Sequence, residues 1–459
     1  MTVLDAVGPS PGAPAAAAPA AASIAVTAEP ALPVTLPAAP PAPAIGMATG
    51  RFFGTEESYW RLMIRGAVLL LVTLGIYRFW LATDQRRFLW ANTEIAGDAL
   101  EYAGTARELL IGFLIAMAVL VPLYVVLSLA ALGSDVIGQF SGLIALLVLV
   151  LFGPFAIYRA RRYRLTRTIF RGLRLHQTGS AGLYAVYSIL GWAATLATFG
   201  LAYPWAQAAL ERYKMHHTFY GDVGGRFVGS GTHLFLRGIG LWLLILGPLL
   251  ASVVYAVATI DGNVVADAVQ RGGNNMLGRI ESQIPNFSAA LTAVVMASFW
   301  SVITAALLYP AFQAMMLRWW TSGLRFGDMV ATSRVRTGQM YGLYLRFVGF
   351  SLLFGLAAAI VGLIVGIVVP LPGLDEEKFA ELDTFAQIAG VVVGVIGYVV
   401  LMLGYSTIYQ VTVKLRLWRL SFETAELTGL AALERVNAAG APGSAFGEGL
   451  ADALDIGGL

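Results

Sequence analysis

The chain has no cysteine and little charge. Lys, Arg, Asp and Glu make up 12% of its 459 residues, whereas 58% are hydrophobic and the mean hydropathy is +0.73. The absence of cysteine excludes disulfides and thiol chemistry. The scarcity of charge excludes an ordinary soluble globular protein, and a net charge of only +3 gives no electrostatic signal for a nucleic-acid partner.

Catalytic and metal-binding patterns are also missing. The four histidines include one adjacent pair, His216 and His217, whose side chains point in different directions on a helix. No serine lies in a Gly-x-Ser-x-Gly turn, and no Gly-Lys-Ser/Thr follows the glycine-rich run Gly221–Gly229. We therefore expect no enzymatic activity, no cofactor and no metal.

Long apolar runs dominate the rest of the chain. Six of them are longer than the ~20 residues that an α-helix needs to span a bilayer. They are Leu109–Ser134, Val136–Tyr158, Gly238–Ile260, Ser288–Pro310, Phe347–Leu374 and Thr384–Val413. We interpret each run as a transmembrane helix. Their interiors carry no Asp, Glu, Lys, Arg or His, which argues against transport driven by buried carboxylates.

Two further segments, 59–80 and 183–205, fit three descriptions. The uncharged part of the first has 12 residues and covers roughly 18 Å, which is short of a ~30 Å hydrocarbon core. The second is longer but is interrupted by Gly191 and Gly200. Each is a full span, a re-entrant hairpin or an interfacial helix.

The distribution of Lys and Arg favours the re-entrant or interfacial description. If both segments return to the side they left, 27 of the 30 basic residues share one side of the membrane with both termini. If both segments span, the division becomes 16 against 14. Because membrane proteins place Lys and Arg in the cytoplasm, we predict six spans plus two short segments, with both termini cytoplasmic.

A polar insert occurs three times between apolar runs. In each copy an Arg precedes an aromatic residue, and the Asp of a Gly-Asp pair follows ten or eleven residues later. The residues concerned are Arg87, Gly97, Asp98, Arg212, Gly221, Asp222, Arg318, Gly327 and Asp328. Short strands on both sides of the Gly-Asp pair predict a small β-hairpin. Either Asp serves the turn, with Arg bound to it or to a helix end, or three Arg–Asp pairs line a vestibule that selects solutes.

Two other patterns accompany the insert. Gly112 and Pro122 match Gly238 and Pro248 in spacing, and each proline predicts a kinked helix. Seven arginines occupy sixteen residues of a predicted basic loop, which either fixes the topology or binds anionic lipid head groups. These arginines are Arg159, Arg161, Arg162, Arg164, Arg167, Arg171 and Arg174.

The first copy of the insert resembles the YjgN-like family of bacterial inner-membrane proteins, whose function is unknown. The resemblance rests on Thr73-Leu74-Gly75-Ile76-Tyr77, Trp80, Arg86-Arg87-Phe88, Asn92-Thr93, Gly97, Tyr102 and Gly104. It extends over roughly residues 50–430 and implies a multi-pass protein of the bacterial inner membrane. It implies no activity.

Together these observations predict an all-α integral membrane protein with small cytoplasmic β-hairpin inserts and internal repeats. The expected organisation is a disordered Ala/Pro-rich tail at 1–46, membrane repeats at 47–182 and 183–342, a partial repeat at 343–430 and a flexible tail at 431–459. The leading functional hypothesis is passage of a small solute or lipid through a helix bundle. The alternative is a membrane scaffold or regulator whose inserts bind a partner or anionic lipid.

Overall fold

The computed structural model of the protein describes residues 47–133, 135–271, 276–368, 384–433 and 436–439. These residues belong to one compact unit, Ile45–Leu459. The tail predicted at 1–46 and most of the one predicted at 431–459 lie outside the described residues. The other predicted boundaries fall inside helices, since residues 183 and 343 lie within Ala181–Ala197 and Thr337–Val368.

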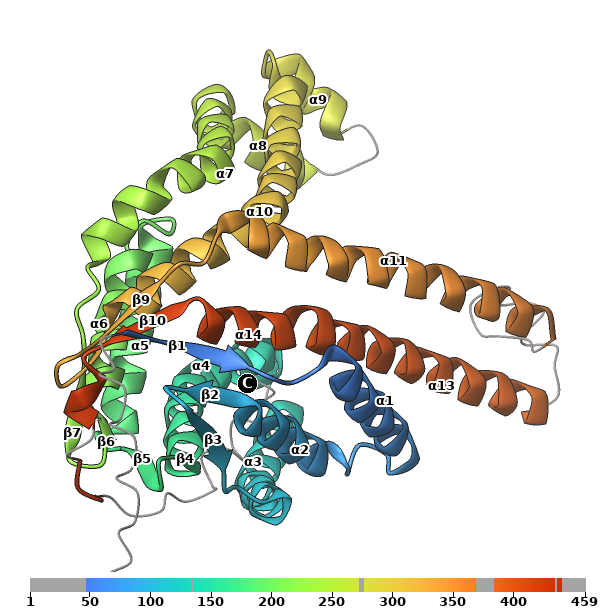
Figure 1. The fold of residues 1–459 in the computed structure, drawn as a ribbon. Helices are drawn as coiled ribbons and strands as arrows, with labels where there is room; N and C mark the ends of the chain where they lie inside the picture. Colours follow the sequence, from blue (N-terminus) through green and yellow to red (C-terminus); the bar gives the residue numbers. More distant parts are fainter. Residues whose placement is uncertain (1–46, 134, 272–275, 369–383, 434–435, 440–459) are drawn as a thin grey trace, which may run out of the picture. The chain divides into compact units, whose positions relative to one another are not determined.

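Ten short antiparallel strands form a closed barrel (Figure 1). They are β1 (Met47–Phe52), β2 (Thr93–Ile95), β3 (Asp98–Tyr102), β4 (Thr168–Phe170), β5 (Leu173–Gln177), β6 (Thr218–Tyr220), β7 (Val223–Phe227), β8 (Leu324–Phe326), β9 (Met329–Ser333) and β10 (Ala425–Thr428). Each strand pairs with its neighbours in the chain, and β1 closes the ring by pairing with both β2 and β10. The expectation of an all-α fold with separate hairpins is therefore wrong.

The physical reason for the error is the pairing between hairpins. A lone two-stranded hairpin is marginally stable in water, and a local sequence pattern does not show which distant hairpin lies beside it. Met47, for example, pairs with Thr428. Closing the ring gives every strand two partners and leaves no unpaired edge.

A two-residue turn joins the two strands of each of the four hairpins, and these turns differ in register. Ala96 and Gly97 have φ angles of 53° and 91°, which suit a type I′ turn, and Asp98 then begins β3. Gly221 and Gly327 are instead the first residues of their turns, so Asp222 and Asp328 take the second turn position. The three Gly-Asp pairs are thus not equivalent. The fourth turn, Arg171-Gly172, lies in the predicted basic loop.

Pairs of helices connect the hairpins, so the order strand, two helices, strand occurs five times. The pairs are α1 (Glu56–Val72) with α2 (Arg78–Ala91), α3 (Ala106–Gly133) with α4 (Asp135–Thr166), α5 (Ala181–Ala197) with α6 (Tyr203–His216), α7 (Gly231–Thr259) with α10 (Phe287–Gly323), and α11 (Thr337–Val368) with α13 (Thr384–Tyr409). The short helices α8 (Gly262–Arg271) and α9 (Met276–Gln283) lie between α7 and α10. A π-helical segment η1 (Gln410–Leu415) and α14 (Arg416–Glu423) lead from α13 to β10, and the 3₁₀ turn η2 (Leu430–Leu433) follows it.

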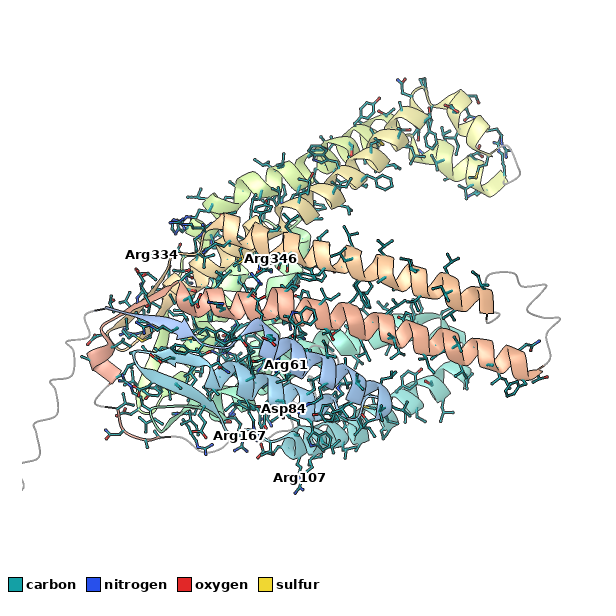
Figure 2. All side chains as sticks on the ribbon, turned by 45° about the vertical axis from the view of Figure 1, so that its right-hand side comes forward. Arg61, Asp84, Arg107, Arg167, Arg334 and Arg346 are labelled. Atoms are coloured by element: carbon teal, nitrogen blue, oxygen red, sulfur yellow. The ribbon has the colours of Figure 1, made fainter. Side chains whose placement is uncertain are left out.

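Six of these helices are long and apolar enough to cross a membrane, in agreement with the number predicted. They are Ala106–Ala130, Gly138–Thr166, Gly231–Thr259, Phe287–Gly323, Thr337–Ile367 and Gln387–Glu423, with mean hydropathies of 2.0 to 2.8. At most 17% of the most apolar stretch of any of them is buried inside the protein. Figure 2 shows that labelled charged side chains such as Arg167, Arg334 and Arg346 lie toward the barrel, away from the far ends of α11 and α13.

The two short segments form helical hairpins that begin and end at the barrel, because β1 pairs with β2 and β5 pairs with β6. They turn in the same way. Thr73 bonds the Leu69 carbonyl and accepts from the Tyr77 amide, and Gly75 has a φ of 90°. Thr198 and Gly200 repeat these features in the second hairpin. The shared Thr-x-Gly pattern thus encodes a tight turn between two helices.

Candidate functional site

The three arginines of the repeated insert hold helices to the barrel. Arg87 donates to the Gly104 carbonyl at 3.1 Å, Arg212 to the Gly229 carbonyl at 3.1 Å, and Arg318 to the Val335 carbonyl at 3.2 Å. Each arginine lies on a helix that enters the barrel, and each carbonyl lies just after a strand that leaves it. The three hydrogen bonds are equivalent, and each joins a helix to the end of a strand. They lie at the end of the barrel from which the helices extend, which we call the helix end.

The three aspartates lie at the opposite end, beside the hairpin turns. Asp98 pairs with Arg171 of the neighbouring hairpin at 2.6 Å. Asp222 accepts hydrogen bonds from the backbone and side-chain amides of Asn437 at 3.1 and 3.2 Å, which hold the pKa of Asp222 below its usual range. The arginines and aspartates of the insert are thus brought to different ends of the strands.

The other predicted residues lie on helices and in one hairpin. Pro122 and Pro248 are inside α3 and α7, Gly112 is buried in α3, and Gly238 packs near Met315. The predicted basic loop is not a loop. Arg159, Arg161, Arg162 and Arg164 lie on the last turns of α4, Arg167 follows this helix, Arg171 is in a hairpin turn and Arg174 is on β5.

A cavity of about 500 Å³ occupies the lumen of the barrel. Successive residues of a strand face opposite sides of a sheet, so every second side chain points inward. The strand residues that line the lumen include Gly50, Ile95, Leu100, Phe170, Leu175, Tyr220, Phe326, Met329, Ala331 and Leu427. The sequence contained a signal for some of these residues, the alternation of apolar and polar side chains in strands such as β8 (Leu-Arg-Phe) and β10 (Ala-Glu-Leu-Thr). Sequence reasoning missed the lumen because it did not predict that the hairpins join.

Three tryptophans line the helix end of the lumen: Trp90, Trp320 and Trp418. Trp90 donates its indole N–H to Thr168 at 3.0 Å, and Trp418 donates to Thr93 at 2.9 Å. Their ring centroids are 4.6 Å apart. The hydroxyls of the barrel satisfy these indole N–H groups, which leaves apolar ring surface toward the cavity.

The turn end of the lumen is covered by η2, which we call the plug. Leu430 and Leu433 are 1% and 8% exposed and pack against Phe170, Tyr220 and Met329. Gly429 directs the chain over the barrel with a φ of 75°, a conformation that favours glycine. The bonds from Asn437 to Asp222 fasten the chain just beyond the plug.

The lumen is suited to binding an apolar ligand. The cavity is within the volume range of ordinary ligand sites, and its wall is almost entirely hydrocarbon and aromatic. Within the described residues, no group of three or more His, Asp or Glu side chains comes together to hold a metal ion.

Comparisons with known proteins agree with this picture of a membrane protein. The inner membrane protein YjgN of Escherichia coli strain K12 is 33% identical over 63 residues, which cover 14% of this chain and 16% of that protein. The YjgN of Escherichia coli O157:H7 is 33% identical over 64 residues, with the same coverage. No solved structure matches the chain. Residues 48–453 match the family described as "Bacterial protein of unknown function (DUF898)", and the chain therefore belongs to this family.

Proposed function

We propose that this protein is a bacterial inner-membrane protein that holds one hydrocarbon chain of a membrane lipid in the lumen of its barrel. The apolar cavity of about 500 Å³ is the observation that carries the proposal. An engineered protein cavity of ~150 Å³ accepts benzene, which corresponds to roughly 25 Å³ per carbon. By this measure the lumen has room for a chain of roughly 20 carbons.

The placement of the barrel supports a lipid as the ligand. All six long helices begin or end near the barrel, so the barrel lies on one face of the bilayer when these helices span it. The positive-inside rule favours a cytoplasmic location for that face, because 27 of the 30 basic residues lie on that side if the two short segments do not span the membrane. The strands nearest both ends of the described chain, β1 and β10, are part of the same barrel.

The helices favour lipid handling over passage of a solute through a bundle. Within the described residues α7 packs chiefly with α10, and the most apolar stretches of the long helices are at most 17% buried. Helices arranged in this way present most of their surface to lipid. They supply little of the polar interior that a water-soluble solute needs.

The test is photocrosslinking of the full chain in detergent with hexadecanol that carries a diazirine near the end of its chain. We expect crosslinks to peptides that contain lumen residues such as Leu100 and Met329. Ala331, which is 3% exposed, lines the lumen, whereas Thr332 is exposed on the outer face of the same strand. A benzene ring occupies a cavity of ~150 Å³ in a protein interior, so Ala331→Phe should reduce lumen labelling several-fold, and Thr332→Phe should leave it unchanged.

One labelling pattern would contradict the proposal. Labelling confined to the long helices, and equal in the wild type and both variants, would refute lipid binding in the lumen. The alternative of a scaffold or regulator would then be the better description.

A further inference from the structure

A second cavity, of about 280 Å³, lies between the first helical hairpin and the last long helix. Its walls come from α1, α2, α13 and the start of η1. Polar side chains gather in it, although most of its other lining residues are aliphatic. The polar residues are Arg78, Gln85, Ser406, Thr407 and Gln410. We call this cavity the polar pocket.

Gln410 contributes a buried acceptor that the fold does not use. It is the first residue of η1, and its Oε1 is shielded from solvent and has no hydrogen-bond partner within the described part of the chain. Buried polar atoms of side chains are normally paired. π-helical turns such as η1 frequently occur at functional sites. An unpaired acceptor in the wall of a cavity therefore calls for a donor from a ligand.

Gln85 contributes a donor that has a poor partner. The residue is 6% exposed, and its Nε2 donates to the sulfur of Met63 at 2.8 Å. A thioether is a weak acceptor, so an oxygen atom of a ligand is a better partner for this amide. Thr407, which is also 6% exposed, lines the same pocket. The pocket thus offers a donor and an acceptor within one small space.

The corresponding cavity elsewhere in the protein is apolar. Arg78 and Gln410 lie the same number of residues before β2 and β10 as Tyr203 and Tyr309 lie before β6 and β8. The two tyrosines line a separate cavity of about 260 Å³ between α6, α7 and α10, whose other lining residues are apolar. Because the same helical framework packs there with apolar residues, the fold does not require the amides of the polar pocket.

The polar pocket lies at the depth of the lipid head groups when α13 spans the bilayer. Gln410 is one helical turn before Lys414, which ends the uncharged run that begins with α13. The pocket reaches the surface of the protein, because Ser406 is exposed. Ile64 and Met402, each next in sequence to a lining residue, are 54% and 56% exposed. A membrane lipid can therefore place its head group in the pocket while its chains stay in the hydrocarbon region.

The charges of the pocket favour a neutral head group. Arg78 is the one ionisable residue among the described residues that line it. Its guanidinium lies over the rings of Phe79 and Phe113, 5.7 and 5.6 Å from their centroids, and is already engaged by other groups. The lining residues include no carboxylate that could pair with an ammonium group. A hydroxyl suits the pocket, because it can donate to one amide and accept from the other.

We infer that the polar pocket binds the neutral, hydroxyl-bearing head group of a membrane lipid, such as a glycerol moiety. A vicinal diol carries two hydroxyls, one for the Gln410 acceptor and one for the Gln85 donor. This site is separate from the lumen and does not depend on the proposed function.

The test is photocrosslinking of the full chain in detergent with 1-O-hexadecylglycerol that carries a diazirine on its chain close to the ether oxygen. Hexadecyl methyl ether with the same diazirine is the matched probe, because it lacks both hydroxyls. Gln410→Leu and Gln85→Leu each remove one amide of the pocket. Gln270→Leu is the control, because Gln270 is an exposed glutamine of α8.

We expect peptides that contain Thr407 and Gln410 to reach half-maximal labelling at an about tenfold lower concentration of the glycerol ether than of the methyl ether. Two hydrogen bonds between neutral groups together contribute enough for such a change. Each pocket variant should reduce this preference several-fold, and Gln270→Leu should leave it unchanged. The thermal unfolding midpoint of Gln410→Leu should equal or exceed that of the wild type, because the substitution removes an unpaired buried acceptor.

Three results would overturn the site. The first is equal half-maximal concentrations of the two probes in the wild type, and the second is a preference that survives both pocket variants. The third is a lower unfolding midpoint for Gln410→Leu than for the wild type and Gln270→Leu, because the Gln410 amide would then be bonded within the fold.

Unlabelled competitors test the chemistry of the ligand. Hexadecylglycerol should displace the probe, whereas the same concentration of glycerol should not. Glycerol that displaces the probe equally well would overturn the lipid part of the inference, and stronger displacement by hexadecyl phosphate would overturn the neutral head group. Peptides from the lumen, such as those with Leu100 and Met329, are separated in the same digest. Absence of labelling there would count against the proposed function and leave the polar pocket standing.

Discussion

The buried carboxylate of Glu211 offers a sharp test of the electrostatics at the helix end of the barrel. Glu211→Gln keeps the size of the side chain and an oxygen that accepts from Trp320. It removes the negative charge that faces Lys214 at 2.5 Å. The ammonium group of Lys214 then faces a neutral amide in place of a carboxylate.

The expected loss of stability is large because both partners are covered. Removing one member of a buried ion pair costs about 3–5 kcal/mol, since the other member stays charged and poorly solvated. Glu57 provides the matched control. It pairs with Arg61, and the two side chains are 74% and 78% exposed. An exposed pair contributes only about 0–1 kcal/mol, so Glu57→Gln should leave the free energy of unfolding almost unchanged.

The assay is unfolding of the purified full chain in detergent, followed by tryptophan fluorescence, with the free energy of unfolding compared among variants. The double variant Glu211→Gln with Lys214→Met should recover part of the loss, because it removes the uncompensated ammonium. A loss for Glu211→Gln no larger than that for Glu57→Gln, or no recovery in the double variant, would show that the Glu211–Lys214 pair is solvated. The charge argument would then fail.

Three further predictions follow from other parts of the structure. Burial, assisted by the charge of Arg162, lowers the pKa of His176. The unfolded chain therefore binds the proton at a higher pH than the folded chain, and the free energy of unfolding falls as the pH drops below about 6.5. His176→Gln should reduce this fall when unfolding is measured at pH values above and below about 6.5. Gly429→Ala should destabilise the protein by about 1–3 kcal/mol, because the residue has a φ of 75° and a Cβ would lie 2.5 Å from the Asp328 carbonyl oxygen; thermal unfolding of the variant checks this, and an unchanged midpoint contradicts it. Glu101→Cys, on the exposed outer face of β3, should resist a membrane-impermeant thiol reagent in intact cells and react after lysis, whereas labelling of intact cells would place the barrel outside.

Local patterns in the sequence predicted local structure well. The six long helices follow from runs free of charge, and three hairpins follow from glycine-containing turns between short strands. The fourth hairpin was missed because Arg171 and Gly172 lie in a run of arginines that suggests a solvated loop. Spacing also suggested that the Gly-Asp pairs were equivalent, whereas the register of the turns differs by one residue.

The closed barrel and its lumen lay beyond sequence reasoning for a different reason. The pairing of β1 with β10 joins segments that are far apart in the chain, and no local periodicity specifies such a partner. The contact of Glu211 on α6 with Trp320 on α10 has the same origin, because the two residues are far apart in the chain.

The closure of the ring by β1 and β10 also constrains how the protein is made. The ribosome delivers β1 first and β10 last among the ten strands, so nine strands must wait as an open arc while three long helical hairpins enter the membrane. During that time the two edge strands of the arc expose unpaired backbone N–H and C=O groups, which can pair with strands of other chains. Arrival of β10 ends this vulnerable period, and the plug follows it directly in the chain. The last strand thus acts as a completion step, and nascent chains that stall before it are expected to be targets for chaperones or proteases.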